Sequence, residues 1–119
     1  RDTSSSRYIA QLDERKALRD YVEAEMDALG LDALVYPPAQ QPARPTGLVQ
    51  TNNCGFGSTT AMPSIVVPAG FSSDQPALPI GIEFFGRSWD EATLFGIAYA
   101  YEQSTQHRRR PILPGDPAP

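Results

Sequence analysis

The sequence predicts an α/β fold whose central sheet is larger than this chain can build alone. Two apolar segments, residues 64–68 and 78–85, are bounded by Pro and Gly and rich in Ile, Val and Phe, which is typical of buried strands. Neither alternates cleanly, since residues 65–67 are all apolar and Phe84 adjoins Phe85. A strand that is apolar on both faces belongs in a sheet covered on both sides. The 119 residues contain too few other strands to complete such a sheet.

The charge of the chain argues against nucleic acid as its ligand. Its formal net charge is −4, and only the three arginines at 108–110 form a basic run. Binding to phosphates needs a basic face, so we expect no nucleic-acid contact by this segment. No apolar run approaches the roughly 18 residues that span a bilayer. We therefore expect no membrane span, with a cytoplasmic location favoured.

The start of the sequence and its single cysteine bear on how the chain is made. Cys54 is the only cysteine, so no internal disulfide can form. The sequence begins with Arg1 rather than Met and shows no apolar signal-type segment near its start. We therefore expect a processed, proteolysed or truncated piece of a longer protein.

The first regular element is predicted to be an amphipathic helix over residues 12–29, after a polar lead-in at 1–11 that should be a loop. Helical spacing separates apolar from charged positions. The apolar positions are Leu18, Tyr21, Val22, Met26 and Leu29, and the charged ones are Arg15, Arg19, Glu23 and Asp27. Asp13 is the expected N-cap. Gly30, followed by Leu31, predicts a left-handed C-cap with a hydrophobic contact.

A short strand is predicted next, over residues 32–36. It should end at Pro37 and Pro38, which cannot donate ladder hydrogen bonds. A helix, a glycine and a strand in quick succession are typical of an α/β unit. Residues 39–47 are rich in Pro and Gln and should be irregular. Residues 48–60 are small, polar and glycine-containing, and they come directly before the first apolar strand.

A second long helix should follow the strands, starting at Trp89. Ser88 and Glu91 have the spacing of a capping box. The apolar face comprises Leu94, Ile97, Ala98 and Tyr101, broadened by Phe95 and Tyr99. Gly96 is expected to mark close packing, because glycine inside a helix costs about 1 kcal/mol relative to Ala. We expect Arg87 and Glu91 to form a structural ion pair or a cap rather than a catalytic pair.

No group of residues in the chain has the spacing of an active site. A nucleophile needs a base within hydrogen-bond reach. His107, the only histidine, lies in a basic helix end, and Lys16, the only lysine, lies near the charged side of the first helix. Cys54 has no histidine near it in sequence, so we expect it to act as a small apolar residue rather than as a nucleophile. Metal-ligand spacing is absent, so we expect no catalytic residue, no metal and no cofactor.

From residue 61 onward the sequence resembles the C-terminal signature of the amidase signature family. The matching positions are Pro63, Val67, Gly70, Phe71, Leu78, Pro79, Gly81, Gly86, Arg87, Glu91, Leu94, Glu102 and Gln103. The preceding helix and short strand extend the resemblance over most of residues 12–112. A Pro-rich tail at 113–119 completes the chain.

The resemblance implies the C-terminal part of an α/β/α sandwich with a large mixed sheet, incomplete on its own. It also implies an amidase that hydrolyses a carboxylic amide to an acid plus ammonia or an amine through a serine acyl-enzyme. The family's Ser–cisSer–Lys triad is not matched here, because Lys16 is not the family lysine and residues 4–6 lack the glycines of the serine loop. The fragment alone should be inactive. Its expected partners are the upstream part of the same amidase, as a separate chain or a missing segment, and a small-molecule amide, with a homo-oligomer left open.

The segment before the first apolar strand is the candidate substrate wall. Ligands of open α/β sheets bind at the loop ends of such strands. We expect Asn53, Cys54 and Phe56 to bind substrate, with Phe56 supplying apolar area. The alternative is that residues 52–60 form a tight turn that only positions the strand.

Two other functions stay open at this point. One is the amidase component of a glutamine-dependent amidotransferase, which would need a second protein as its partner and would pass ammonia to a charged transfer RNA. The other is a non-enzymatic interaction module descended from an amidase, with Pro- and Tyr-rich binding surfaces.

Overall fold

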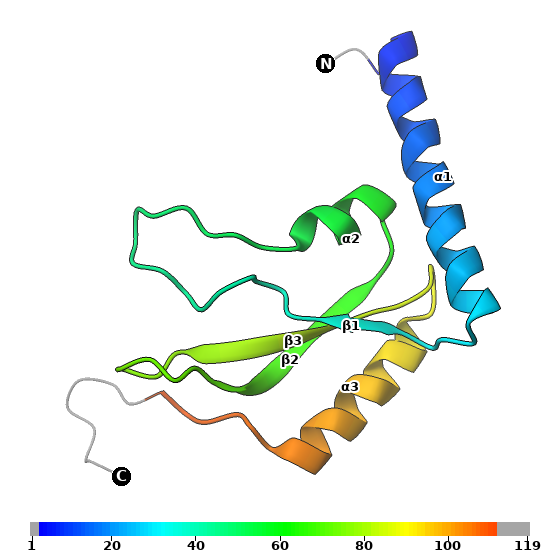
Figure 1. Cartoon of the computed structure of the whole chain (residues 1–119). Helices are drawn as coiled ribbons and strands as arrows, with labels where there is room; N and C mark the ends of the chain where they lie inside the picture. Colours follow the sequence, from blue (N-terminus) through cyan, green and yellow to red (C-terminus); the bar gives the residue numbers. More distant parts are fainter. Residues whose placement is uncertain (1–2, 112–119) are drawn as a thin grey trace.

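The computed structural model describes residues 3–111, which form a three-stranded sheet and three helices (Figure 1). The elements are α1 (Ser6–Ala28), β1 (Leu34–Tyr36), α2 (Cys54–Thr60), β2 (Ser64–Phe71), β3 (Pro79–Phe85) and α3 (Glu91–Thr105). The sheet lies at the centre, with α3 packed against one face and α2 near the other. The predicted Pro-rich tail at 113–119 lies outside the described residues.

The sheet is antiparallel, with the strand order β1-β3-β2. β2 and β3 form a hairpin in which Val67 lies opposite Ile82, and β1 pairs with β3 so that Tyr36 lies opposite Glu83. The predicted apolar strands are confirmed, but among the described residues only β3 has a strand on both sides. The chain thus builds a small part of a sheet.

α1 begins earlier than predicted. Ser5 is its N-cap, and the Ser5 side chain accepts a hydrogen bond from the Tyr8 backbone N–H at 3.3 Å. The prediction of a loop is therefore wrong for residues 6–11, and Asp13 lies inside the helix instead of capping it. The serine run supplies an N-cap, which lets the helix start as soon as the chain leaves it.

The end of α1 is as predicted. Gly30 has a left-handed φ of 64°, its N–H donates to the Asp27 carbonyl, and the Leu31 N–H donates to the Met26 carbonyl. These two bonds make a Schellman motif. Leu31 packs in the same apolar cluster as Met26, which supplies the expected hydrophobic contact.

The start of α3 differs from the prediction. The Ser88 N–H donates to Glu23 Oε1 of α1 at 2.8 Å, and Arg87 Nη2 lies 2.9 Å from Asp27 Oδ1. The predicted Ser88–Glu91 capping box and Arg87–Glu91 ion pair are therefore wrong. Carboxylates of α1 lie beside this turn and take the donors that local spacing had assigned to Glu91.

The middle and the end of α3 differ in how closely they pack. Gly96 is exposed, and a Cβ added there would meet nothing within 4 Å, so the predicted close packing is not made among the described residues. The helix ends at Thr105 with Gln106 as its C-cap, and His107 follows directly. The Arg109 guanidinium lies over the Phe71 ring, 4.9 Å from its centroid, which holds the following segment against the hairpin.

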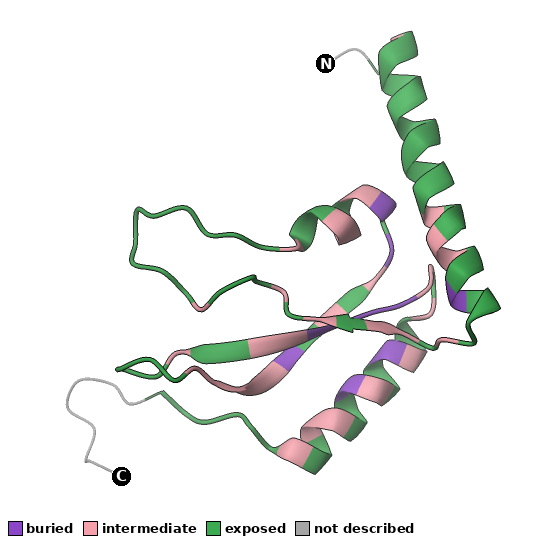
Figure 2. Ribbon diagram, in the orientation of Figure 1, coloured by how far each residue is buried: buried purple, intermediate pink, exposed green. Residues whose placement is uncertain are grey.

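Two apolar clusters lie on opposite faces of the sheet, because they contain the adjacent strand residues Phe84 and Phe85. Figure 2 marks the buried positions of the ribbon in purple. The cluster on the α3 face contains Val67, Phe84, Leu94 and Ala98. The cluster on the α2 face contains Met26, Met62 and Phe85, with Val22, Leu31, Leu34, Tyr36 and Phe56 packed against it. Figure 2 also shows that the first turns of α1 are exposed, so this helix is tied to the body through its last turns.

Candidate functional site

The segment singled out as a substrate wall folds as a short helix, α2, rather than as a tight turn. Its start is tied to the chain that leaves β1. Asn53 Nδ2 donates to the Pro37 carbonyl at 2.7 Å, and the Asn53 backbone N–H donates to the Pro38 carbonyl at 2.9 Å. Asn52 Oδ1 accepts from the Cys54 N–H at 3.1 Å. These bonds fix α2 at the carboxyl end of β1.

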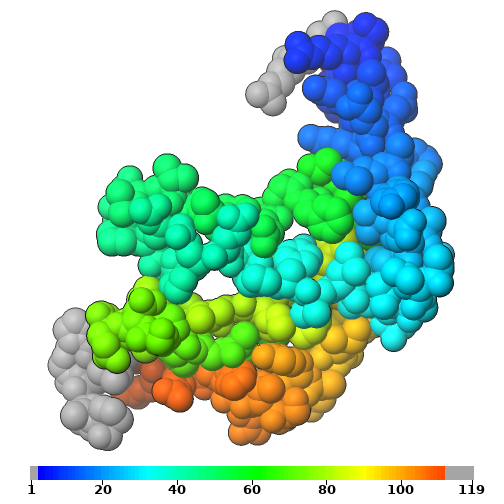
Figure 3. Space-filling model, viewed as in Figure 1, coloured from blue at the N-terminus to red at the C-terminus, as the bar shows by residue number. Residues whose placement is uncertain are grey.

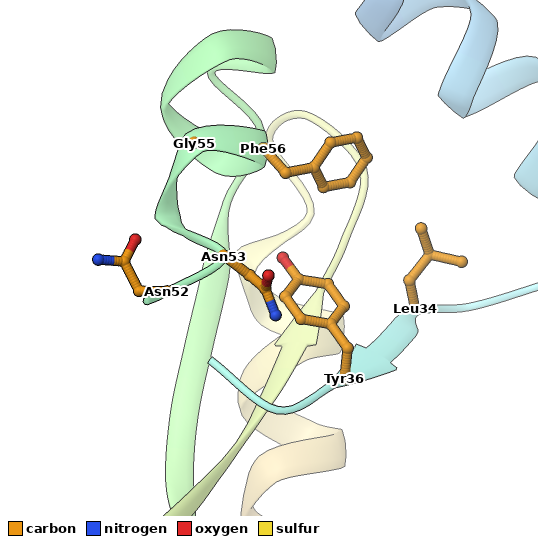
Figure 4. Close-up of a pocket in the computed structure, with 6 residues that line it drawn as sticks. All are labelled: Leu34, Tyr36, Asn52, Asn53, Gly55 and Phe56. Atoms are coloured by element: carbon orange, nitrogen blue, oxygen red, sulfur yellow. The ribbon is translucent and has the colours of Figure 1, made fainter. Parts of the chain in front are cut away.

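A groove of about 420 Å³ lies between the start of α2 and β1 (Figure 4). Its lining residues are Leu34, Tyr36, Asn52, Asn53, Gly55 and Phe56. Two of the three predicted site residues, Asn53 and Phe56, thus line one groove. Cys54 is exposed and is not among the lining residues. That these residues bind substrate stays a prediction.

The apolar wall of the groove is held by aromatic rings that pack against one another at a tilt. The Phe56 ring centroid lies 4.7 Å from that of Phe85, and the Tyr36 centroid lies 6.4 Å from Phe85. Phe85 is 0 % exposed. Because Phe85 is fixed by the core, it fixes the two rings that face the groove.

Tyr36 lines the groove and lies outside the predicted set of site residues. Its Oη is buried and has no hydrogen-bond partner among residues 3–111. Burial, reinforced by the electrostatic influence of the neighbouring Glu83 and Cys54 side chains, raises the pKa of Tyr36 to about 12. The hydroxyl therefore stays protonated at neutral pH. Its place at the last position of the predicted strand was the available signal, because ligands bind where such strands end.

Glu83 adds a negative charge beneath this groove. It lies opposite Tyr36 on β3 and is 7 % exposed. Among residues 3–111 no cationic side chain lies within ion-pair distance of its carboxylate. The sheet face below α2 is therefore electrostatically unfavourable for an anion.

A second hollow, of about 720 Å³, lies under the long loop that connects β1 to α2 (Figure 3). Pro37, Pro38, Gln40 and Gln50 are among its lining residues on the loop side, and Val66, Ile80 and Gly81 are among those on the hairpin side. An isolated bridge between Ala39 and Asn52 closes the loop at its base. The loop therefore stands off the sheet at its tip and is anchored next to the groove.

The remaining candidates for chemistry lie elsewhere. Lys16 pairs with Asp20 on the surface of α1, and the His107 ring lies 6.4 Å from Tyr101 at the end of α3. No group of three metal-ligating side chains occurs in the described part of the chain. No helix within residues 3–111 is long and apolar enough to cross a membrane.

Comparison with known proteins gives relatives over almost the whole chain, although no family model matches it. The chain is 31 % identical to the A component of the glutamyl-tRNA(Gln) amidotransferase of Oceanobacillus iheyensis, over 94 % of this chain and 25 % of the relative. It is 32 % identical to a fatty acid amide hydrolase of Arabidopsis thaliana, over 95 % of this chain and 20 % of the relative.

The fold is also similar to that of solved amidases. The native peptide amidase of Stenotrophomonas maltophilia matches with a TM-score of 0.76 and 32 % identity, over 92 % of this chain and 22 % of the amidase. The architecture is therefore that of α/β amidases, of which this chain spans a quarter or less. These relatives are members of the amidase signature family, and the chain corresponds to a C-terminal portion of that family.

Proposed function

We propose that this chain is the C-terminal segment of an amidase that hydrolyses a carboxylic amide to a carboxylic acid plus ammonia or an amine. The superposition on peptide amidase supports the proposal, because 92 % of the chain follows a single amidase fold. The sequence relatives agree, since they include a fatty acid amide hydrolase as well as amidotransferase components.

The chemistry would come from sequence that this segment does not contain. The family resemblance implies a serine acyl-enzyme with a Ser–cisSer–Lys triad. Lys16, the only lysine, is exposed and paired with Asp20, so it is unsuited to activate a serine, which requires a desolvated or hydrogen-bonded base. The upstream part of the amidase is thus the partner that supplies the triad, and residues 3–111 complete the sheet and one wall of the substrate pocket.

The test is acyl transfer by the complete protein. With a simple carboxylic amide as substrate, we expect release of ammonia, and formation of a hydroxamate when hydroxylamine replaces water as the acceptor of the acyl group. The 119-residue chain alone should do neither. Hydrolysis at enzyme-like rates by the chain alone would show that the triad assignment is wrong.

A component of an amidotransferase is the second candidate, because several sequence relatives carry that name. It predicts that glutamine is the preferred source of ammonia and that an acceptor stimulates its release. The net charge of −4 does not favour transfer-RNA contact by this segment, so a partner protein would have to supply it. Ammonia release from glutamine, measured with and without the acceptor, separates the two functions.

A further inference from the structure

Glu83 is a buried carboxylate without a counter-charge in this part of the molecule. It lies on β3, the middle strand of the sheet, and is 7 % exposed. Among residues 3–111 no basic side chain lies within ion-pair distance of it. A buried charge is costly unless it is paired. The position of Glu83 therefore calls for a cation from outside the described residues.

Basic side chains of this chain are engaged at other places. Arg87 pairs with Asp27 of α1, and Lys16 lies on the surface of the same helix. The Arg109 guanidinium lies over the Phe71 ring at the end of the hairpin. The formal net charge of −4 shows that acidic groups are in excess over the whole sequence. A basic partner for Glu83 is thus a matter of charge complementarity with another segment.

Tyr36 supplies a second unsatisfied group beside the carboxylate. It lies opposite Glu83 in the register of β1 and β3, so both side chains project from the same face of the sheet. The electrostatic influence of Glu83 helps to raise the pKa of Tyr36, so the two groups are near enough to interact. Tyr36 Oη is buried and has no hydrogen-bond partner among residues 3–111. A hydroxyl accepts as well as donates, and a guanidinium or an ammonium carries several N–H donors, so one basic side chain can serve both groups.

The neighbours of Glu83 across the sheet border open space on both sides. Tyr36 lines the groove of about 420 Å³, and Val66, opposite Glu83 on β2, lines the hollow of about 720 Å³. Among residues 3–111, β1 and β2 each have one unpaired edge. A strand added at either edge would lie about 10 Å from β3, twice the usual spacing of strands. A long basic side chain on that strand reaches over Tyr36 or Val66 to the carboxylate.

We propose that Glu83 and Tyr36 form a docking site for a basic side chain, arginine or lysine, of the upstream part of the amidase. The chain covers 22 % of the peptide amidase that it resembles in fold, so most of such an enzyme lies outside this segment. The pair then secures the segment in the complete sheet and does not touch the reacting amide. This inference rests on the proposed function, because it takes the partner to be the remainder of that enzyme.

The test is the sign of a stability change in the complete protein. Glu83→Gln removes the charge and keeps the shape of the side chain. It should lower the unfolding temperature by about 5 °C, because loss of one partner leaves the other charge buried and unpaired. If Glu83 has no counter-charge, the substitution removes an unpaired buried charge, and an unchanged or raised unfolding temperature overturns the inference. Glu14→Gln, at an exposed position of α1, is the matched control and should change nothing.

The source of the cation is tested by changing the salt. With an attached side chain, wild type and Glu83→Gln should differ equally in sodium chloride and in tetramethylammonium chloride. A difference seen only with sodium would mean a free ion and overturn the inference.

Two further measurements keep the result decisive. If Glu83→Gln does not fold, Tyr36→Phe takes its place: a lowered unfolding temperature supports the shared basic partner, and an equal or higher one overturns it. Amide hydrolysis by the wild type is measured separately. Its absence contradicts the proposed function, whereas the sign of the Glu83→Gln effect decides the docking site.

Discussion

The two faces of the sheet differ in how far this chain completes them. The α3 face is closed by four side chains that are each at most 9 % exposed: Val67, Phe84, Leu94 and Ala98. The α2 face also has a fully buried centre, Phe85, but the unpartnered Tyr36 hydroxyl and the buried carboxylate of Glu83 lie beside it. A face closed by apolar side chains serves packing, whereas a face with open polar groups is suited to hold a ligand.

The largest effect should come from the centre of the α2 face. Phe85→Ala removes a fully buried ring that contacts the aromatic rings of Tyr36 and Phe56, and should lower the free energy of unfolding by about 3–5 kcal/mol. Phe95→Ala, at a position 64 % exposed on α3, should change it by less than about 0.5 kcal/mol. Chemical denaturation measures both. Equal effects of the two substitutions would mean that the α2 face has no core of its own.

The packing of the α3 face can be tested at Gly86. A Cβ there would lie 2.9 Å from Leu94 Cγ and 3.0 Å from Leu94 Cδ2. Gly86→Ala should therefore cost about 1–3 kcal/mol through overpacking. Leu94→Ala should cost about 2–5 kcal/mol through the cavity it leaves.

The double substitution gives the sharper result. Because the new methyl group fills space vacated by Leu94, the Gly86→Ala/Leu94→Ala protein should be less destabilised than the sum of the two single changes. Denaturation of the four proteins completes the cycle. Strict additivity would show that the α3 face is loosely packed and no better closed than the α2 face.

The stability of the α2 face should depend on pH in the alkaline range. The pKa of Tyr36 is raised to about 12 in the folded chain, chiefly by burial, against an ordinary value of 10.0. The folded state thus holds the Tyr36 proton more tightly than the unfolded state does, so protonation of Tyr36 favours folding. This contribution to the free energy of unfolding is complete below pH 10 and is lost as the pH rises towards 12. The unfolding temperature should fall more steeply over this window in the wild type than in Tyr36→Phe. Identical pH profiles would show that Tyr36 is not shielded from water.

The smallest effect should come from the ion pair that joins α1 to the start of α3. The Asp27 side chain is 71 % exposed and that of Arg87 is 26 % exposed. Such pairs contribute about 0–1 kcal/mol, so Asp27→Asn should lower the free energy of unfolding by no more than this, and by less at high salt. Asp20→Asn, which breaks a pair exposed on both sides, is the matched control. A loss above about 2 kcal/mol, beyond the usual range for exposed pairs, would mean that this contact holds α1 in place.

Elements set by local chemistry could be predicted from the sequence. Gly30 fixes the end of α1 because a left-handed residue there favours glycine, and the Ile, Val and Phe runs fix β2 and β3. The sequence predicts only that residues 52–60 precede the first apolar strand; the bond from Asn53 to the chain that leaves β1 is a finding of the structure.

Features set by distant contacts could not be predicted. The Ser88 N–H bonds to Glu23, 65 residues away, although Glu91 has the local spacing of a partner. Whether the Tyr36 hydroxyl has a partner depends on how α2 lies over β1, which no periodicity in the sequence reveals. Gly96 gave a false signal of packing because no neighbour approaches it among the described residues.

The outer strands of the sheet have a practical consequence for work with the isolated chain. Among residues 3–111, β1 and β2 are each paired on one side only. Their outer edges carry backbone donors and acceptors next to apolar side chains such as Val35, 56 % exposed, and Val66, 51 % exposed. Such edges pair readily with those of another copy. Production of the chain by itself therefore invites aggregation through intermolecular sheets.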